Sequence, residues 1–292
     1  MSKRFLHLIE GAGAILLYAF FRALPLDAAS AVGGFLARTI GPRLGLSRRA
    51  LKNLRRALPE LDDAAASRVI VGTWDNLGRV IAEYPHLGQY RVYAEDGRIE
   101  MVGAEHIRAQ SAPGKRAIFF SGHFGNWEVP TLALTQAGLD VVEMYRAANN
   151  PIVDRLMSHS RGFVGSELAA KGSAGARRML AAMKAGRHIA MLVDQKANDG
   201  IAVPFFGAHA MTMPSPAVFA RRFACALIPV RVDRVKGARF RITCEPALEP
   251  TFTGDDKADT LAIMTQINRV LERWIRERPD HWFWVHRRWP ES

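Results

Sequence analysis

The sequence predicts an α/β protein with a largely parallel central sheet flanked by helices and with an N-terminal helical, membrane-associating segment. Three observations support this class. Residues 1 to about 92 show mostly helical patterns. From about residue 98, short apolar runs alternate with helical stretches, as in a parallel sheet with crossover helices. The chain has 292 residues, 49% of them hydrophobic, which is enough to bury one substantial core.

Residues 1–25 are expected to form the membrane-associating helix. The stretch from Phe5 to Leu24 has about the length of a transmembrane helix but contains Glu10 and Arg22, and it shows no convincing signal-peptide cleavage site. A basic cluster follows at residues 43–56, which adds on the order of 1 kcal/mol per cation near an anionic leaflet. We expect a marginal span or an interfacial helix, with the main domain cytoplasmic if it spans. The alternative is an ordinary buried helix.

The remaining chain, residues 26–292, is expected to be one domain, helical to about residue 95 and α/β from about residue 98. A basic helix begins at Leu46 or Ser47 and ends before Pro59, and a second runs from Asp62 through Ile81. Strands are predicted at residues 117–121, 140–145, 188–193, 227–232 and 239–244. Helices are predicted at residues 127–137, 151–160, 172–185, 216–223 and 259–278.

The stretch Ser121-Gly-His-Phe-Gly-Asn-Trp-Glu128 is the most informative part of the chain. An imidazole is the usual group for taking a proton from a hydroxyl, and a nearby carboxylate fixes its tautomer. Residues five apart on one helix are separated by roughly 140°, so the pair requires His123 on a loop and Glu128 in the first helical turn. Gly125 permits a tight turn and Asn126 is a good N-cap. The alternative is a structural loop histidine.

Three of the predicted strands are followed by polar residues. His123 follows the first, Arg146 the second, and Asp194-Gln195 the third. Because ligands gather at the carboxyl ends of the strands in open α/β sheets, we expect these residues to converge on one edge.

The net charge of +12 and a pI near 10.3 indicate anionic partners: phosphate, anionic lipid, nucleic acid or an acidic protein. The two cysteines, Cys225 and Cys244, have no CxxC spacing. They favour a reducing compartment and are most simply small core residues.

The octapeptide resembles the active-site motif of the lysophospholipid acyltransferase-like superfamily and, more narrowly, of the late lipid A acyltransferases, the lauroyl and myristoyl transferases of Gram-negative bacteria. Other blocks agree in order and spacing. They are Asn76-Leu-Gly-Arg79 with Glu83, Tyr145-Arg146 with Asn149-Asn-Pro151 and Arg161, Asp194-Gln195 followed by Val203-Pro-Phe-Phe-Gly207 and Thr212, and His281-Trp-Phe-Trp-Val-His-Arg-Arg-Trp289. The combination is specific, whereas any single block is not. One departure is Pro214, where a glycine is expected.

This resemblance implies transfer of an acyl chain from an acyl-carrier-protein thioester to a hydroxyl of a lipid A precursor. His123 would take the hydroxyl proton and Glu128 would orient the imidazole, so residues 26–292 would form an acyltransferase domain. The amides around Gly125 and Asn126 are plausible donors to the oxyanion. The resemblance also implies a location on the cytoplasmic face of an anionic inner membrane, without nucleic acid, metal or cofactor.

Four residues are candidates for substrate binding. Arg146 and Arg161 would bind acceptor phosphate or sugar, since guanidinium binds phosphate bidentately. Asp194, followed by Gln195, would pair with one of these arginines or orient the acceptor. The alternatives are surface arginines and a structural cap. The Trp-rich C-terminal stretch with Arg287 and Arg288 suits an interfacial lipid contact, a nucleic-acid surface or simple packing.

Three other functions remain open. The first is a glycerophospholipid or glycolipid acyltransferase that uses acyl-CoA, because the wider superfamily has a closely similar motif. The second is a basic membrane- or nucleic-acid-binding protein without catalysis. The third is a metal hydrolase built on His123, Glu128, Asp194 and His209, which the absence of an HExxH pattern disfavours.

Overall fold

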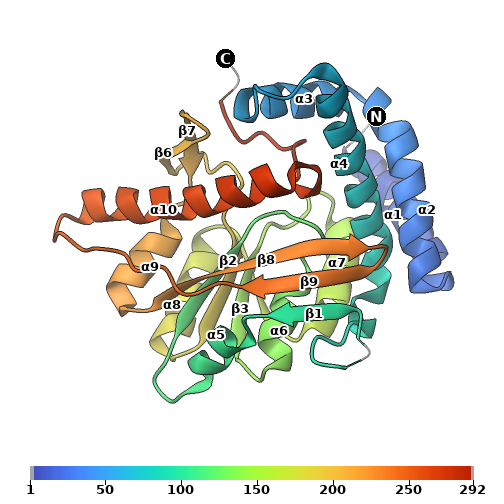
Figure 1. Ribbon diagram of the computed structural model, residues 1–292. Helices are drawn as coiled ribbons and strands as arrows, with labels where there is room; N and C mark the ends of the chain where they lie inside the picture. The colour runs from blue at the N-terminus through green and yellow to red at the C-terminus, as the bar shows by residue number, and fades with distance from the viewer. Residues whose placement is uncertain (1–2, 96, 291–292) are drawn as a thin grey trace.

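The computed structural model describes residues 3–95 and 97–290, so the outer ends of the two expected segments, 1–25 and 26–292, lie outside it. A seven-stranded sheet forms the centre, in the order β1-β9-β8-β2-β5-β3-β4 (Figure 1). Its strands are β1 (Ile99–Val102), β2 (Ala117–Ser121), β3 (Val141–Tyr145), β4 (Glu167–Ala170), β5 (His188–Leu192), β8 (Ala226–Lys236) and β9 (Arg239–Cys244). The predicted α/β class with a largely parallel sheet is confirmed.

The parallel part of the sheet carries the site. Strands β8, β2, β5, β3 and β4 run parallel, whereas β9 is antiparallel to β8 and β1 is parallel to β9. Every residue of β2 is buried, because helices cover both faces of a central parallel strand. The register aligns Ser121 with Leu192, and Met191 with Met144. The loops that leave β2, β5 and β3 therefore begin side by side at one edge.

Helices flank this sheet (Figure 1). They are α5 (Ala104–Arg108), α6 (Val129–Gln136), α7 (Pro151–Arg161), α8 (Ser173–Lys184), α9 (Ser215–Phe223) and α10 (Asp256–Glu277). The prediction of a helix from residue 127 began two residues early, because Glu128 is the N-cap of α6. Short 3-10 helices are η1 (Gly41–Arg43), η2 (Tyr84–Gln89), η3 (Ala109–Ser111), η4 (Gly162–Val164) and η5 (Pro279–His281).

Four strands escaped the sequence analysis. Strands β1 and β4 have four residues each and lie at the two edges of the sheet, too short for a clear hydrophobic period. The other two, β6 (Ile201–Phe205) and β7 (Ala208–Thr212), pair as a separate antiparallel hairpin. Pro204 within β6 reads as a strand breaker, and an isolated hairpin tolerates it because the strand has a free edge.

The N-terminal part is helical, as predicted. It contains α1 (Lys3–Ala23), α2 (Leu26–Ile40), α3 (Gly45–Ala57) and α4 (Asp63–Glu83), and the Asp62 carboxylate caps α4 by accepting a hydrogen bond from the Ala65 amide at 2.6 Å. Helices α2 and α4 pack closely because Gly33 and Gly78 face each other. A Cβ built on Gly78 would lie 2.1 Å from the Gly33 carbonyl oxygen.

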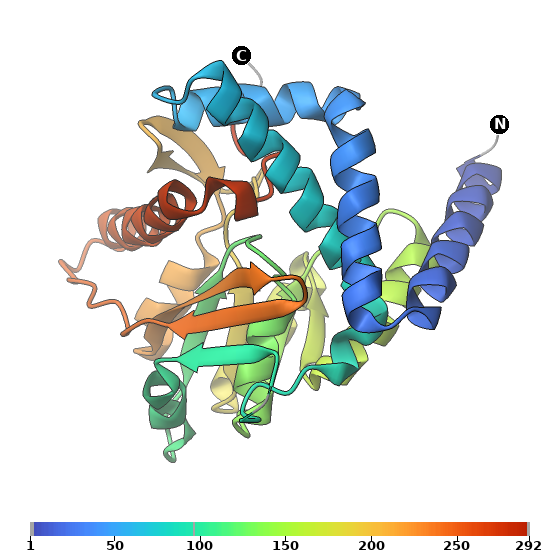
Figure 2. The same ribbon diagram turned by 45° about the vertical axis from the view of Figure 1, so that its right-hand side comes forward.

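Helix α1 lies at the edge of the molecule, beside α7 (Figure 2). Within it, Phe5–Ala23 is long and apolar enough to cross a membrane, with a mean hydropathy of 1.4, and only 11% of that window is buried. An ordinary buried helix, the alternative from the sequence, is therefore wrong.

Candidate active site

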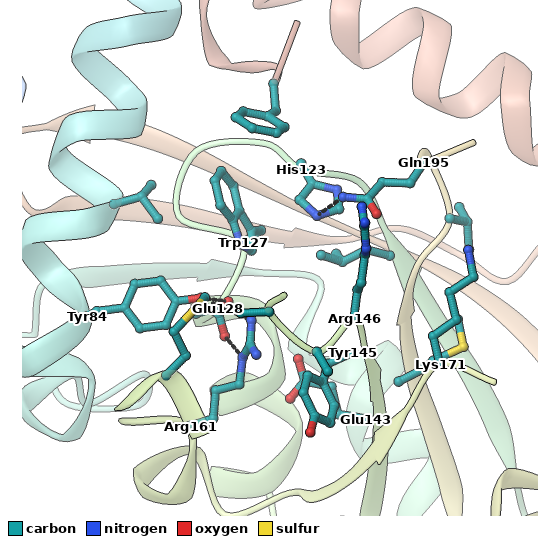
Figure 3. Close-up of a pocket in the computed structure, with 18 of the residues that line it drawn as sticks. Tyr84, His123, Trp127, Glu128, Glu143, Tyr145, Arg146, Arg161, Lys171 and Gln195 are labelled. Atoms are coloured by element: carbon teal, nitrogen blue, oxygen red, sulfur yellow. Dashed lines mark hydrogen bonds and ion pairs between the residues drawn. The ribbon is translucent and has the colours of Figure 1, made fainter. Parts of the chain in front are cut away.

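A cavity of about 420 Å³ opens at the carboxyl edge of the parallel strands. His123 from the loop after β2, Arg146 from the end of β3 and Gln195 from the loop after β5 line it together (Figure 3). The prediction that the polar residues after these strands converge is confirmed. One wall is apolar and comes from α4 and α7, through Leu77, Val80, Ile81 and Met157.

The carboxylate partner of His123 is Asp194. The Nδ1 atom of His123 lies 2.7 Å from Oδ1 of Asp194, and the His123 backbone amide donates to Oδ2 at 2.8 Å. Since a carboxylate accepts hydrogen bonds, Nδ1 carries the proton and Nε2 is left as the basic nitrogen. Burial works to raise the pKa of Asp194, but the positive charge and hydrogen bonds of His123 outweigh it, so the net pKa lies well below the usual value. Asp194 therefore stays ionised.

Residues of the C-terminal stretch hold His123 and Asp194 in place by hydrogen bonds. The Trp282 indole Nε1 donates to Oδ2 of Asp194 at 2.8 Å, and the Phe283 amide donates to the His123 carbonyl at 3.1 Å. Trp282, Trp284 and Trp289 are at most 3% exposed, and so is Arg288, which donates to Thr212 Oγ1 at 2.9 Å. The interpretations of these side chains as an interfacial or nucleic-acid surface are wrong, because they form packed core.

The Nε2 atom of His123 faces Gln195. The Gln195 side-chain Nε2 lies 3.1 Å from it, and with Nδ1 protonated the amide is the donor. The Gln195 amide therefore covers this nitrogen on the cavity side. Gln195 is half-buried and lines the cavity.

Glu128 lies in the same cavity but binds other groups. It accepts from Arg161 Nη2 at 2.7 Å and Nε at 2.8 Å, and the Tyr84 hydroxyl also donates to it (Figure 3). Burial works to raise the pKa of Glu128, but the Arg161 guanidinium prevails and the net shift is downward. Arg161 is itself 8% exposed, and its Nε and Nη2 atoms donate to Glu128 and Tyr84. Its binding of acceptor phosphate or sugar stays a prediction.

The two acids thus hold different partners from those expected. The sequence predicted that Glu128 would bind the imidazole and that Asp194 would bind an arginine or orient the acceptor, whereas Asp194 contacts His123 and Glu128 binds Arg161. The physical reason is the strand order. Strand β5 is the direct neighbour of β2, so its loop meets the His123 loop, whereas Glu128 begins a helix and points toward α7.

The turn after His123 has the expected break but not the expected donors. Gly125 adopts φ +47°, which glycine tolerates, and Asn126 Oδ1 accepts from the Glu128 amide at 3.2 Å. However, the Gly125 amide donates to the His281 carbonyl at 3.2 Å, Asn126 is fully buried, and neither residue lines the cavity. This geometry contradicts the expectation that these amides bind an oxyanion.

The ion pair between Arg234 and Glu83, next to the site, was not predicted from the sequence. Arg234 pairs with Glu83 inside the protein and donates to Asn76 Oδ1 at 3.0 Å, and Asn76 in turn donates to the Gly125 carbonyl at 2.9 Å. This network holds the His123 turn against α4. The family-like block at residues 76–83 was its only sequence signal, and Arg234 gave none.

Glu143 is a second buried acid of the cavity. It is 8% exposed and accepts from the Ser166 hydroxyl at 2.9 Å. Burial, together with the negative charge of Glu128, raises its pKa to about 7. A glutamate in the middle of the predicted strand 140–145, flanked by apolar residues, was the signal that could have found it.

The fold and the site together are those of an α/β enzyme in which Asp194 holds His123 beside a cavity with one apolar wall. The sequence pattern of the bacterial lipid A biosynthesis acyltransferase family matches residues 1–291. The chain belongs to this family and is an acyltransferase of lipid A biosynthesis.

Curated relatives agree. The chain is 25% identical to the lipid A biosynthesis acyltransferase of Haemophilus influenzae, over 93% of this chain and 83% of that protein. It is 28% identical to the lipid A biosynthesis lauroyltransferase of Escherichia coli K12, over 81% and 76% of the two chains. The solved 1-acyl-sn-glycerophosphate acyltransferase of Thermotoga maritima covers 84% of this chain and 99% of its own length at 12% identity. Its TM-score of 0.38 is too low to bear on the fold. The family excludes the non-catalytic and metal-hydrolase alternatives.

Proposed function

We propose that this enzyme transfers a fatty acyl chain from an acyl-carrier-protein thioester to a hydroxyl of a lipid A precursor, with His123 as the general base. The observation that carries the proposal is the His123–Asp194 contact of 2.7 Å, which leaves a basic Nε2 facing the cavity. A base within hydrogen-bond reach of an acceptor hydroxyl contributes about 10²–10⁴ to the rate.

The reaction then proceeds without a protein nucleophile. Nε2 of His123 takes the hydroxyl proton as the oxygen attacks the thioester carbonyl, and a C–O bond forms. The tetrahedral intermediate collapses as the C–S bond breaks, and the imidazolium returns its proton to the thiolate. Asp194 stabilises the imidazolium throughout. We assign the oxyanion to the Gln195 amide, which the incoming hydroxyl releases from Nε2.

We also propose that Glu128, which the sequence predicts to be catalytic, acts on His123 through its negative charge. The Glu128 carboxylate lies near enough to His123 that the positive charge of a protonated His123 lowers the pKa of Glu128. The two charges therefore stabilise each other. By binding Arg161, Glu128 also fixes the wall of the cavity beside α7. The His123/Glu128 dyad therefore stays a prediction, with Asp194 added as the orienting acid.

The surface around α1 supports a membrane location, which we assign to the cytoplasmic face of the inner membrane of a Gram-negative bacterium. Large apolar side chains of α1 are 43–71% exposed: Phe5, Leu6, Leu8, Ile9, Ile15, Leu16, Leu17 and Phe20. Exposed apolar residues continue on α2 with Phe35 and Leu36. Ile81, which is 45% exposed, lines the cavity wall that these helices flank, so a lipid acceptor can enter from the bilayer side.

The donor is tested by comparing the two thioesters in separate reactions. Purified full-length protein is incubated with a tetra-acylated lipid A precursor and either acyl-carrier-protein thioesters or acyl-CoA, and the product mass is followed. We expect one acyl gain with the carrier thioester. A gain with acyl-CoA alone would favour the alternative, an acyl-CoA enzyme, and no gain on lipid A with any chain length would refute the proposed acceptor.

His123 is tested in the same assay. His123→Gln removes the base but can keep a hydrogen bond to Asp194, and we expect turnover to fall by about 10³-fold or more. Lys184→Gln, at an exposed position at the end of α8, is the matched control and should retain full turnover. Unchanged turnover in His123→Gln would remove the general base from the mechanism.

A further inference from the structure

A second cavity of about 690 Å³ adjoins the catalytic one. The two cavities share Arg146, Lys171, Gln195 and Phe283. A group bound in the second cavity therefore lies next to the reacting centre rather than at a remote surface. Apart from Gln195, none of the residues proposed for the acyl-transfer step lines this second cavity.

The lining of this second cavity is strongly basic. Its cations come from five separate segments of the chain: Arg49 from α3, Arg146 after β3, Lys171 after β4, Lys196 after β5, and Arg287 near the C-terminus. Among the residues that the structure describes, Asp199 is the one acid in the lining. Across residues 3–95 and 97–290, no ion pair joins Arg146, Lys171 or Lys196 to a carboxylate. Arg161, by contrast, is neutralised by Glu128.

The crowding of these cations is itself unfavourable. Partial burial, and then the positive charge of Arg146, lower the pKa of Lys171. Like charges held together in a concavity destabilise each other unless an anion joins them. Five segments far apart in the sequence converge here, so the cluster is a product of the fold rather than of a basic run.

One neutral side chain, that of His286, lies among these cations. Its side chain lines the second cavity, and both ring nitrogens are buried without a hydrogen-bond partner among the described residues. Burial lowers the pKa of His286 to about 3, so the ring is neutral and holds one N–H donor. Because the ring is neutral, His286 adds no positive charge to the cations around it.

We propose that this cavity binds a phosphate group of a substrate while the reacting groups occupy the neighbouring cavity. This inference rests on the proposed function and adds a subsite to it. Guanidinium and ammonium groups together are the usual donors to phosphate oxygens, and a phosphate ester carries enough charge to engage several of them. The phosphate belongs either to the sugar of the glycolipid acceptor or to the pantetheine arm of the acyl carrier.

The test uses the double variant Lys171→Gln/Lys196→Gln in the full-length protein, with Lys184→Gln as the matched control. Both lysines are at least partly exposed, so their loss leaves the core intact. Steady-state kinetics give the KM for the lipid A precursor and the KM for the carrier thioester separately. We expect one KM to rise about tenfold or more, with kcat changed by less than about threefold. A rise for the precursor assigns the sugar phosphate, and a rise for the thioester assigns the pantetheine phosphate.

A binding measurement separates this inference from the proposed function. Thermal unfolding is followed with glucosamine 1-phosphate or with 4′-phosphopantetheine as soluble probes. We expect one probe to raise the Tm of the unsubstituted protein and of Lys184→Gln, and to lose at least about tenfold in apparent affinity in the double variant. If transfer to lipid A fails but a probe binds in this way, the site stands while the proposed function falls. If neither probe shifts the Tm, or the double variant responds like the control, the inference is overturned.

Discussion

Asp194→Asn tests the central contact of the site. The substitution keeps the size of the side chain but removes its charge. The Oδ2 position accepts from two donors, the His123 amide and the Trp282 indole, both at 2.8 Å, so the asparagine oxygen will occupy it. The asparagine NH₂ group then faces Nδ1 of His123. It forces Nδ1 to accept a hydrogen bond and Nε2 to carry the proton, which is the wrong tautomer for a base.

The expected loss follows from the geometry. At 2.7 Å, an imidazolium and a carboxylate attract each other by about 6 kcal/mol at an effective dielectric constant of about 20. That energy corresponds to about 10⁴ in rate, and the equivalent substitution in the serine protease triad also lowers kcat by about 10⁴. We therefore expect kcat to fall by about 10³–10⁴, with the acceptor KM changed by less than about threefold.

The assay is acyl transfer at saturating donor over a range of acceptor concentrations, with thermal unfolding as a control for folding. Glu128→Gln is the contrasting variant. It leaves the buried Arg161 without its ion-pair partner, so we expect a stability loss of about 3–5 kcal/mol together with a smaller fall in kcat. If Asp194→Asn kept kcat within tenfold while folded Glu128→Gln lost 10³-fold, Glu128 would be the orienting acid and this argument would be refuted.

Three further predictions concern pH, packing and the membrane. Because the pKa of Glu143 is about 7 in the folded protein, stability falls progressively between pH 4.5 and 7. In denaturant titrations, Glu143→Gln should have the same free energy of unfolding as the unsubstituted protein at pH 4 and about 3 kcal/mol more at pH 8. Gly78→Ala drives a methyl group into the Gly33 carbonyl, so it should cost about 1–3 kcal/mol; an unchanged Tm would contradict the close helix contact. Leu8→Lys/Leu16→Lys on exposed α1 should weaken sedimentation with anionic vesicles while leaving the Tm unchanged; a drop in Tm would show that these side chains stabilise the fold.

Much of the fold was predictable because it depends on local patterns. Strands β2 and β9 have the predicted bounds, and the alternation of apolar runs with helices gave the correct class. Strand β8 extends four residues past its predicted end, because the hairpin with β9 continues into charged residues that no hydrophobic period marks. The edge strands β1 and β4 gain their structure from pairing, not from their own sequence.

The sequence by itself determined the class of the fold, the loop position of His123 and the set of polar residues that follow β2, β3 and β5. These features follow from hydrophobic period, turn residues and the family-like blocks. Only the tertiary structure decided which acid serves which base. Asp194 is 71 positions from His123 and reaches it because β5 pairs with β2, whereas Glu128 is five positions away and points to Arg161. Strand pairing is a long-range choice made by burial of the whole sheet, so short-range spacing could not reveal it.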